Sequence, residues 1–155
     1  MIDPINRSPR FTVARQEELR ESIELFFFAY RAFTERPDRI LARRGLGRVH
    51  HRILYFVGRD PGISVNRLLS TLAVSKQALN GPLRRLLESK LVSAQSAEHD
   101  LRIKQLRLTA DGARLEGQLT GTQMQQLAGV FANAGSEAET RWRVLMRQMS
   151  NYSVE

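Results

Sequence analysis

Residues 64–90 contain two short helical patterns that only two residues, Ala73-Val74, separate, and this spacing limits the fold more than any other feature. Serine precedes each pattern, at Ser64 and Ser75, and serine is a preferred N-cap because its hydroxyl accepts a backbone N–H. The apolar positions recur at intervals of three and four residues, as in an amphipathic helix: Val65, Leu68, Leu69 and Leu72, then Leu79, Leu83, Leu86 and Leu87. The sequence therefore predicts a helix-turn-helix.

The second pattern contains Gly81-Pro82, a pair that usually marks a turn. Its leucines nevertheless keep one helical phase on both sides of the pair, which two independent segments would not need. We therefore expect a single helix that runs to Lys90. Pro82 removes a backbone N–H and clashes with the carbonyl of Ala78, at a cost of up to ~3 kcal/mol, so a kink should relieve part of the strain.

A charged hairpin follows. Residues 91–97 have strand character, residues 98–100 form a turn, and residues 101–108 alternate apolar and polar side chains as a second strand. Upstream, residues 47–57 predict a helix that stops at Gly58, before a turn at residues 60–62. A helix-turn-helix followed by a β-hairpin is a winged helix-turn-helix, whose second helix enters the DNA major groove by its N-terminal end.

The start of the second helix carries side chains suited to DNA. Serine can contact phosphate, lysine donates hydrogen bonds, and glutamine or asparagine can pair bidentately with adenine, so we expect contacts from Ser75, Lys76, Gln77 and Asn80. Arg84 and Arg85 lie further along, where phosphate contact is more natural. Arg67, on the first helix, contacts phosphate or faces solvent. The alternative for the whole set is an ordinary exposed helix face.

The net charge of +8 is concentrated in the middle of the chain. Residues 48–114 carry twelve basic and five acidic side chains, whereas the segments before and after are close to neutral. Of the 24 basic residues, 21 are arginine, whose planar fork matches phosphate and guanine. A localised basic lobe indicates a polyanionic partner; the alternative is a role in solubility alone.

The outer segments predict further helices. One begins near Thr12, after a loose arm at residues 1–11, and should end at Pro37. At residues 26–28 this helix is apolar around most of its circumference, which indicates burial on more than one side. We expect a partner subunit to cover the second side. Thr109 opens a long helix that Gly135 breaks, and residues 136–139 have capping-box spacing before a last helix.

Several functional classes find no support in the sequence. The chain has no cysteine, which excludes thiol catalysis, thiolate metal sites and thiol redox sensing. No apolar run reaches the ~18 residues of a membrane span, and the N-terminus has no signal-peptide pattern, so we expect a cytoplasmic protein. Neither a nucleophile elbow nor a Gly-rich phosphate loop is present, so we expect no enzyme.

The run VSKQALNGPLRRLLESKLV, followed by DLRIKQLRLTADG, resembles the MarR family of bacterial transcriptional regulators over roughly residues 20–150. The motifs are the helix that starts at Ser75, the Asp-x-Arg of residues 100–102 and the Leu-Thr-x-x-Gly of residues 108–112. The resemblance implies that Arg102 enters the minor groove and that Asp100 orients it; Lys104 should contact phosphate. It also implies an obligate homodimer formed by the first and last helices, here with Phe26, Trp142, Leu145 and Met149.

The resemblance further implies a small effector, often phenolic or carboxylate, between the dimer helices and the DNA-binding lobe. The candidate pocket residues are Phe27, Tyr30, Arg48, His51 and Tyr55, although the core or the dimer interface is the more ordinary place for the aromatic ones. His51 or Arg48 could instead serve an interhelical hydrogen bond. Adjacent residues on a helix point about 100° apart, so His50 and His51 do not share a face and we expect no metal site or cofactor.

These observations predict a mainly α-helical chain with a small β-hairpin wing. We expect an arm and dimerisation helix at 1–46, a winged helix-turn-helix lobe at 47–109 and dimerisation helices at 110–155, intertwined as one domain. The predicted function is a sequence-specific, ligand-responsive repressor that binds a pseudo-palindromic operator as a homodimer in the bacterial nucleoid. The alternative is a constitutive architectural or adaptor protein of the same fold.

Overall fold

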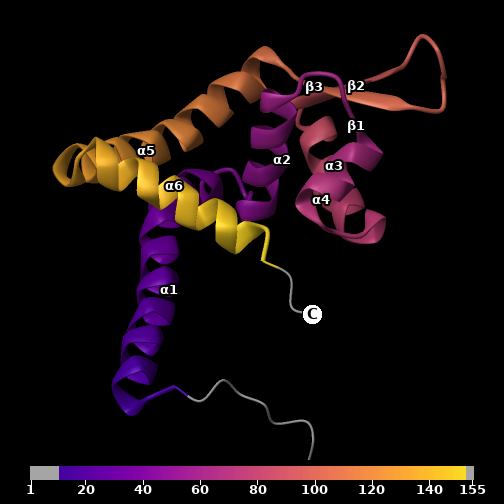
Figure 1. The fold of residues 1–155 in the computed structure, drawn as a ribbon. Coiled ribbons are helices and arrows are strands. Elements are labelled where there is room, and N and C mark those ends of the chain that lie inside the picture. Colours follow the sequence, from indigo (N-terminus) through magenta and orange to yellow (C-terminus); the bar gives the residue numbers. More distant parts are fainter. Residues whose placement is uncertain (1–10, 153–155) are drawn as a thin grey trace, which may run out of the picture. The chain divides into compact units, whose positions relative to one another are not determined.

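The computed structural model describes residues 11–152, which form six helices and three short strands (Figure 1). The predicted arm therefore lies outside the described residues, apart from Phe11. The chain divides into two compact units between Glu35 and Arg36. The first helix, α1 (Val13–Ala42), crosses this division. Within residues 11–152, no helix is both long and apolar enough to cross a lipid bilayer.

The helix-turn-helix is present as predicted. Helix α3 (Val65–Leu72) is capped by Ser64, whose hydroxyl accepts the N–H of Arg67, and α4 (Lys76–Glu88) is capped by Ser75 in the same way. Ala73 takes a left-handed conformation with φ of 51° in the turn between them, which is where the chain reverses direction. The two serine caps thus fix where each helix begins.

Helix α4 is continuous through Gly81-Pro82, so the prediction of one helix is confirmed. Three leucines on one face, Leu79, Leu83 and Leu86, are buried on both sides of the pair. The helix ends at Glu88, two residues before the predicted end, and Lys90 has a positive φ of 55°. Burial of one continuous face therefore outweighs the cost of an internal proline.

The wing belongs to a three-stranded antiparallel sheet in the order β1-β3-β2. Strands β2 (Val92–Ser96) and β3 (Lys104–Leu108) form the predicted hairpin, and β1 (Ile63–Ser64) adds two residues to its other edge. The prediction that the second strand starts at Leu101 is wrong. Residues 101–103 belong to the turn because Asp100 accepts the backbone N–H of Arg102 on its side chain and that of Ile103 on its carbonyl.

Two predicted helix ends are also wrong. Pro37 lies inside α1 rather than at its end, because its ring is fully buried, as is Leu41 one turn later. Packing of this face carries the helix past the missing N–H. Helix α2 (Arg48–Arg59) likewise continues past Gly58 by one residue before the confirmed turn at residues 60–62.

The two C-terminal helices are α5 (Ala110–Ala134) and α6 (Ser136–Ser150). Thr109 caps α5 as predicted, by accepting the N–H of Gly112. The predicted capping box at α6 is wrong: Gly135, with φ of 94°, occupies the cap position, so Ser136 is already helical. Glu139 instead pairs with Arg143, its carboxylate 2.8 Å from the guanidinium.

A leucine-rich core joins the end of α1, α2, α3, α4, the sheet and the first half of α5. Residues with less than 2% exposure anchor it: Leu41, Ile53, Leu54, Val57, Leu68, Leu79, Leu86, Leu106, Leu115 and Leu119. Each such side chain contributes roughly 1.5–3 kcal/mol through burial. At Gly112 a Cβ would overlap the carbonyl oxygen of Leu91, so only glycine allows α5 to pack this closely against the start of the sheet.

Candidate nucleic-acid interface

The first turns of α4 present the predicted DNA-binding side chains to solvent. Leu79 is buried on the inner face, whereas Lys76, Gln77 and Asn80 are exposed and make no side-chain hydrogen bond within residues 11–152. The hydroxyl of Ser75 accepts the N–H of Ala78, so its first task is to cap the helix. The exposed donors and acceptors of this turn remain available for a ligand.

The two arginines on the second half of α4 have different surroundings. Arg84 is exposed. Arg85 is also exposed, but its Nη2 donates to the carbonyl of Arg44, 3.4 Å away in the loop between α1 and α2. Nothing in the sequence pattern indicated this link, because the two residues are 41 positions apart.

Arg102 and Asp100 form a fixed fork at the tip of the wing. The Nε and Nη2 atoms of Arg102 each lie 3.1 Å from one carboxylate oxygen of Asp100, and the backbone N–H of Arg102 donates to the same carboxylate. The side chain of Arg102 is nevertheless 91% exposed. These hydrogen bonds from Arg102 lower the pKa of Asp100, so the pair stays ionised at neutral pH.

The other two basic candidates are also held by neighbours. Lys104 donates from Nζ to the hydroxyl of Ser96, 2.8 Å away on the adjacent strand. Arg67 on α3 lies 3.5 Å from the carboxylate of Asp60, and both groups are substantially exposed. Such an exposed pair contributes little to stability, so the guanidinium of Arg67 can be shared with a phosphate.

His51 makes an interhelical hydrogen bond, one of the two roles that the sequence left open. Its Nε2 lies 3.2 Å from the hydroxyl of Thr120 on α5, and that hydroxyl donates to Glu116. Because the Thr120 proton is used on Glu116, the imidazole Nε2 is the donor to Thr120. Burial of the imidazole lowers the pKa of His51, against an opposite effect of the Glu116 and Asp38 charges.

The remaining pocket candidates are distributed over two units. Arg48 pairs with Asp38 at 2.8 Å, and Tyr55 makes an edge-to-face contact with Phe56. Phe27 and Tyr30 lie on the part of α1 that belongs to the N-terminal unit, where both are exposed. The pocket composed of these residues stays a prediction.

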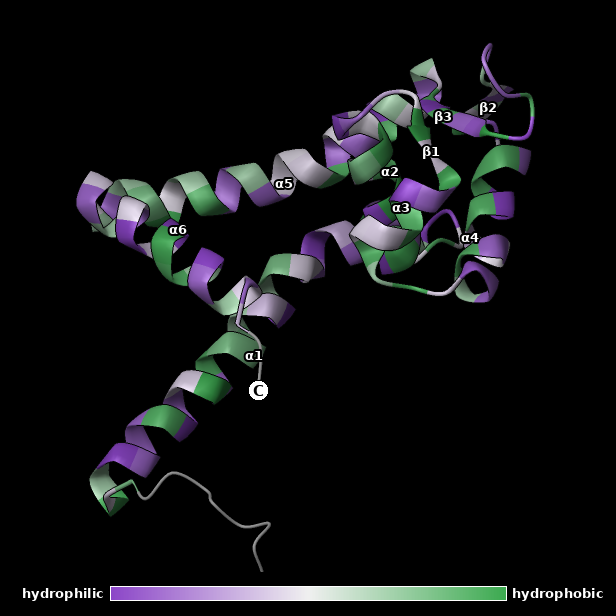
Figure 2. Ribbon diagram, turned by 45° about the vertical axis from the view of Figure 1, so that its right-hand side comes forward, coloured by the Kyte–Doolittle hydropathy of each residue, from purple (hydrophilic) through white to green (hydrophobic). Residues whose placement is uncertain are grey.

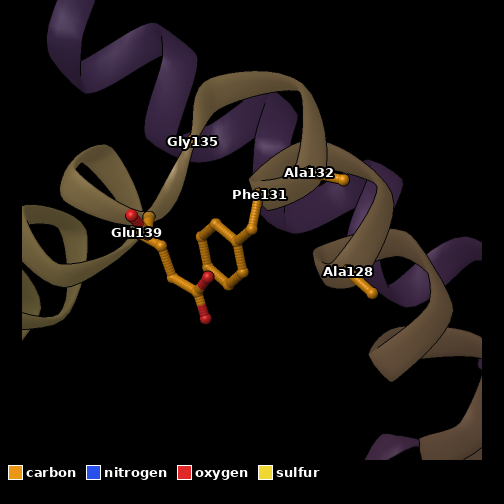
Figure 3. A pocket seen from close by; sticks show the side chains of 6 residues that line it. Ala128, Phe131, Ala132, Gly135 and Glu139 are labelled. Atoms are coloured by element: carbon orange, nitrogen blue, oxygen red, sulfur yellow. The ribbon is translucent and has the colours of Figure 1, made fainter.

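An open hollow of about 400 Å³ lies elsewhere, at the junction of α5 and α6 (Figure 3). The ring of Phe131 and the carboxylate of Glu139 project into it in the close-up, with Ala128 and Ala132 along one side. Phe131 also makes an edge-to-face contact with Trp142, with ring centroids 5.3 Å apart. None of the predicted pocket residues lines this hollow.

Large apolar side chains remain exposed on the predicted dimerisation helices of the single chain. On the N-terminal unit, Phe26 is 51% exposed; on α6, Trp142, Leu145 and Met149 are 40%, 63% and 61% exposed. The ribbon coloured by hydropathy shows hydrophobic residues along α1, the second half of α5 and α6 (Figure 2). Within residues 11–152, no three His, Asp or Glu side chains gather in a way that could hold a metal ion.

Comparison with known proteins agrees with this geometry. The sequence profile of the MarR family matches residues 44–103, from the loop before α2 to the tip of the wing. The HTH-type transcriptional regulator PetP of Rhodobacter capsulatus is 42% identical over 133 residues, which cover 86% of this chain and 80% of PetP. The chain belongs to the MarR family.

Solved structures share its fold at low sequence identity, among them a MarR family transcription regulator. The regulator SP03579 superposes with a TM-score of 0.72 at 19% identity, over 88% of this chain and 91% of that chain. The Staphylococcus aureus MepR F27L mutant, bound to an oligodeoxyribonucleotide, gives 0.56 at 19% identity, over 90% and 96%. NadR in complex with 4-hydroxyphenylacetate gives 0.71 at 18% identity, over 96% and 99%.

The family resemblance and the winged-helix fold predicted from the sequence are therefore confirmed. This MarR-family protein is a DNA-binding transcriptional regulator, and regulators of this family are not enzymes.

Proposed function

We propose that this protein is a sequence-specific repressor that binds a pseudo-palindromic operator as a homodimer and leaves it when a small effector binds. One observation carries the proposal. The fork of Arg102 and Asp100 at the wing tip and the uncommitted polar side chains on the first turns of α4 belong to the same basic lobe. The wing and α4 therefore both offer side chains that can contact DNA bases, in the part of the chain where the positive charge is concentrated.

On DNA, α4 would enter the major groove by its N-terminal end. Gln77 and Asn80 have the amide geometry for adenine, and Lys76 suits guanine or phosphate. The wing would follow the adjacent minor groove, where a guanidinium such as that of Arg102 is attracted by the negative potential. Arg67 and Lys104 would add phosphate contacts that position the lobe without base preference.

The exposed apolar residues of α1 and α6 support the homodimer. A water-soluble monomer rarely leaves several large apolar side chains such as Phe26, Trp142 and Leu145 in contact with water. A second copy would bury them and would place two α4 helices about one helical turn of DNA apart, which suits an inverted repeat.

An effector response is supported by polar side chains that join α2 to α5 and to the end of α1. The pair of His51, which is buried, and Thr120, which is half-buried, and the more exposed pair of Arg48 and Asp38 offer partners for a phenol or a carboxylate. The structural neighbour NadR carries 4-hydroxyphenylacetate, which has both groups. Release of a dimer from its operator by such a ligand would make the protein a ligand-responsive repressor.

The experiment is selection of bound fragments from random duplex DNA at ~0.15 M salt, followed by sequencing. Enrichment of an inverted repeat with half-sites about 10 base pairs apart is the expected result. Retention of DNA without enrichment would refute sequence-specific regulation and would favour an architectural role dominated by phosphate contacts. Addition of aromatic carboxylates to the selected complex then tests effector release.

A further inference from the structure

The loop between α1 and α2, residues 43–47, carries two arginines that the DNA-binding elements described above do not include. Arg43 and Arg44 are exposed, and neither side chain makes an ion pair or hydrogen bond within residues 11–152. Both precede the helix-turn-helix in the sequence.

The loop that presents these arginines is held in one conformation. The N–H groups of Arg44 and Leu46 both donate to the carbonyl of Leu41, at 2.9 and 3.0 Å, and Gly45 donates to that of Ala42. Leu46 is buried in the core, and Gly45 supplies the positive φ of 66° that the turn requires. These contacts hold the backbone of Arg43 and Arg44 in one conformation.

Arg85, on α4, links this helix to the loop of residues 43–47. Its Nη2 donates to the Arg44 carbonyl at 3.4 Å, and the same atom lies 3.4 Å from where a Cβ on Gly45 would stand. His50, on the first turn of α2, also feels the charge of Arg85, which contributes to the lowered pKa of His50 after the larger effect of burial. The loop, the start of α2 and the second half of α4 thus meet at one surface.

This surface carries positive charge that is not neutralised from within the described chain. Arg85 meets the backbone of Arg44 here, Arg43 and Arg84 are their neighbours in the sequence, and none of the four arginines pairs with a carboxylate in residues 11–152. Asp38, the acidic residue before the loop, is engaged by Arg48. Glu88 follows Arg84 by one turn of α4 but is paired with neither arginine. Like charges brought together repel one another, and a polyanion relieves this repulsion.

We propose that Arg43 and Arg44, with Arg85 as the link, form a phosphate-binding surface that grips the DNA backbone outside the groove that α4 enters. The proposal rests on the proposed function, because it needs α4 docked on DNA. Once α4 is in the groove, the loop attached to its second half approaches the backbone that borders the groove. This surface adds affinity and salt dependence but carries no base preference.

The test compares the double variant Arg43→Ala/Arg44→Ala with the wild type on the selected operator, by fluorescence anisotropy over a range of salt concentrations. Each lost phosphate contact lowers the slope of log K against log[salt] by about 0.9, so two contacts per protomer lower it by about 3.6 for a dimer. Preference for the operator over a scrambled duplex should not change. The charge-preserving Arg43→Lys/Arg44→Lys variant should restore most of the slope.

A matched control removes the same charge elsewhere. The variant Arg114→Ala/Arg141→Ala deletes two guanidiniums that pair with Asp111 and Glu137 on α5 and α6, and its slope should stay close to that of the wild type. Neutral methylphosphonate linkages placed along the operator backbone locate the contact. The linkages that weaken the wild type should have no effect on Arg43→Ala/Arg44→Ala.

Three results would overturn the inference. The first is a salt slope in Arg43→Ala/Arg44→Ala that falls no more than in the control variant. The second is a loss of operator preference with an unchanged salt slope, and the third is a salt slope that stays low in Arg43→Lys/Arg44→Lys. The first result would favour an acidic protein, rather than DNA, as the partner of the loop. Each of these leaves the proposed function standing, because the wild type would still select an operator. Failure of the wild type to select one contradicts the proposed function itself.

Discussion

The fork at the wing tip separates two roles that a pair of single substitutions can distinguish. Arg102→Ala removes the guanidinium that would enter the minor groove, at an expected cost of about 1–3 kcal/mol in operator binding, or about 5- to 150-fold in Kd. Protein stability should not change measurably, because the side chain of Arg102 is 91% exposed and its partner is at the surface.

Asp100→Ala perturbs the same fork in the opposite electrostatic direction. The arginine keeps its charge but loses the two 3.1 Å hydrogen bonds that hold its plane and the bond to its backbone N–H. The local charge rises by one, so binding to scrambled DNA should strengthen or stay unchanged, with a steeper salt dependence. Operator binding should gain less than scrambled binding, because a disordered guanidinium must be ordered when it binds.

The assay is fluorescence anisotropy with operator and scrambled duplexes for the wild type, both single variants and the double variant. If Asp100 acts only through Arg102, then Asp100→Ala should leave the operator preference of an Arg102→Ala background unchanged. The reasoning is refuted if Arg102→Ala binds the operator as well as the wild type does. It is also refuted if Asp100→Ala raises the operator preference.

Three further predictions concern helix packing and protonation. Pro82→Ala restores a helical N–H, so it should raise the free energy of unfolding in urea by up to ~3 kcal/mol and leave operator preference unchanged. Gly112→Ala should destabilise the fold by more than 2 kcal/mol, since its Cβ meets a backbone carbonyl, whereas Gly117→Ala, which has open space around it, should stabilise by about 0.5–1 kcal/mol. The pKa of His51 is lowered below 6.5 in the folded protein, so as pH falls the unfolded state takes up the proton before the folded state does. The free energy of unfolding, measured in urea at several pH values, should therefore be constant above pH 6.5 and decrease below it, and the decrease should be smaller in His51→Gln.

Local signals explain what the sequence predicted well. Ser64, Ser75 and Thr109 cap their helices through their own hydroxyl groups, and each cap needs only residues three positions away. The helical spacing of the leucines across residues 79–87 is also a local pattern. It correctly predicts one continuous helix, although Gly81-Pro82 usually indicates a turn.

Features that depend on distant packing were missed for a physical reason. Strand β1 has only two residues, and it exists because Ile63 pairs with Leu106 of β3, which no local pattern indicates. The sequence predicts a helix end at Pro37 because the burial of its ring depends on the core that surrounds it, which no local pattern indicates.

The candidate site shows the same division. The exposed residues of α4 followed from the serine cap and the helical spacing, whereas the fork of Asp100 and Arg102 followed from the resemblance to the MarR family. The contact of Arg85 with the Arg44 carbonyl and that of His51 with Thr120 join elements far apart in the chain. A sequence pattern identifies the residue types available for such contacts but not which of them meet.

The central claim is that the exposed turn of α4 distinguishes one DNA sequence from another. Its most direct test is the ratio of Kd values for scrambled and selected duplexes, measured for the wild type and for Asn80→Ala at ~0.15 M salt. We predict a wild-type ratio of at least about 10³ and a ratio lower by about 5- to 150-fold in the variant, with an unchanged salt slope. A wild-type ratio near one, or an unchanged ratio in Asn80→Ala with a lower salt slope, would contradict the account.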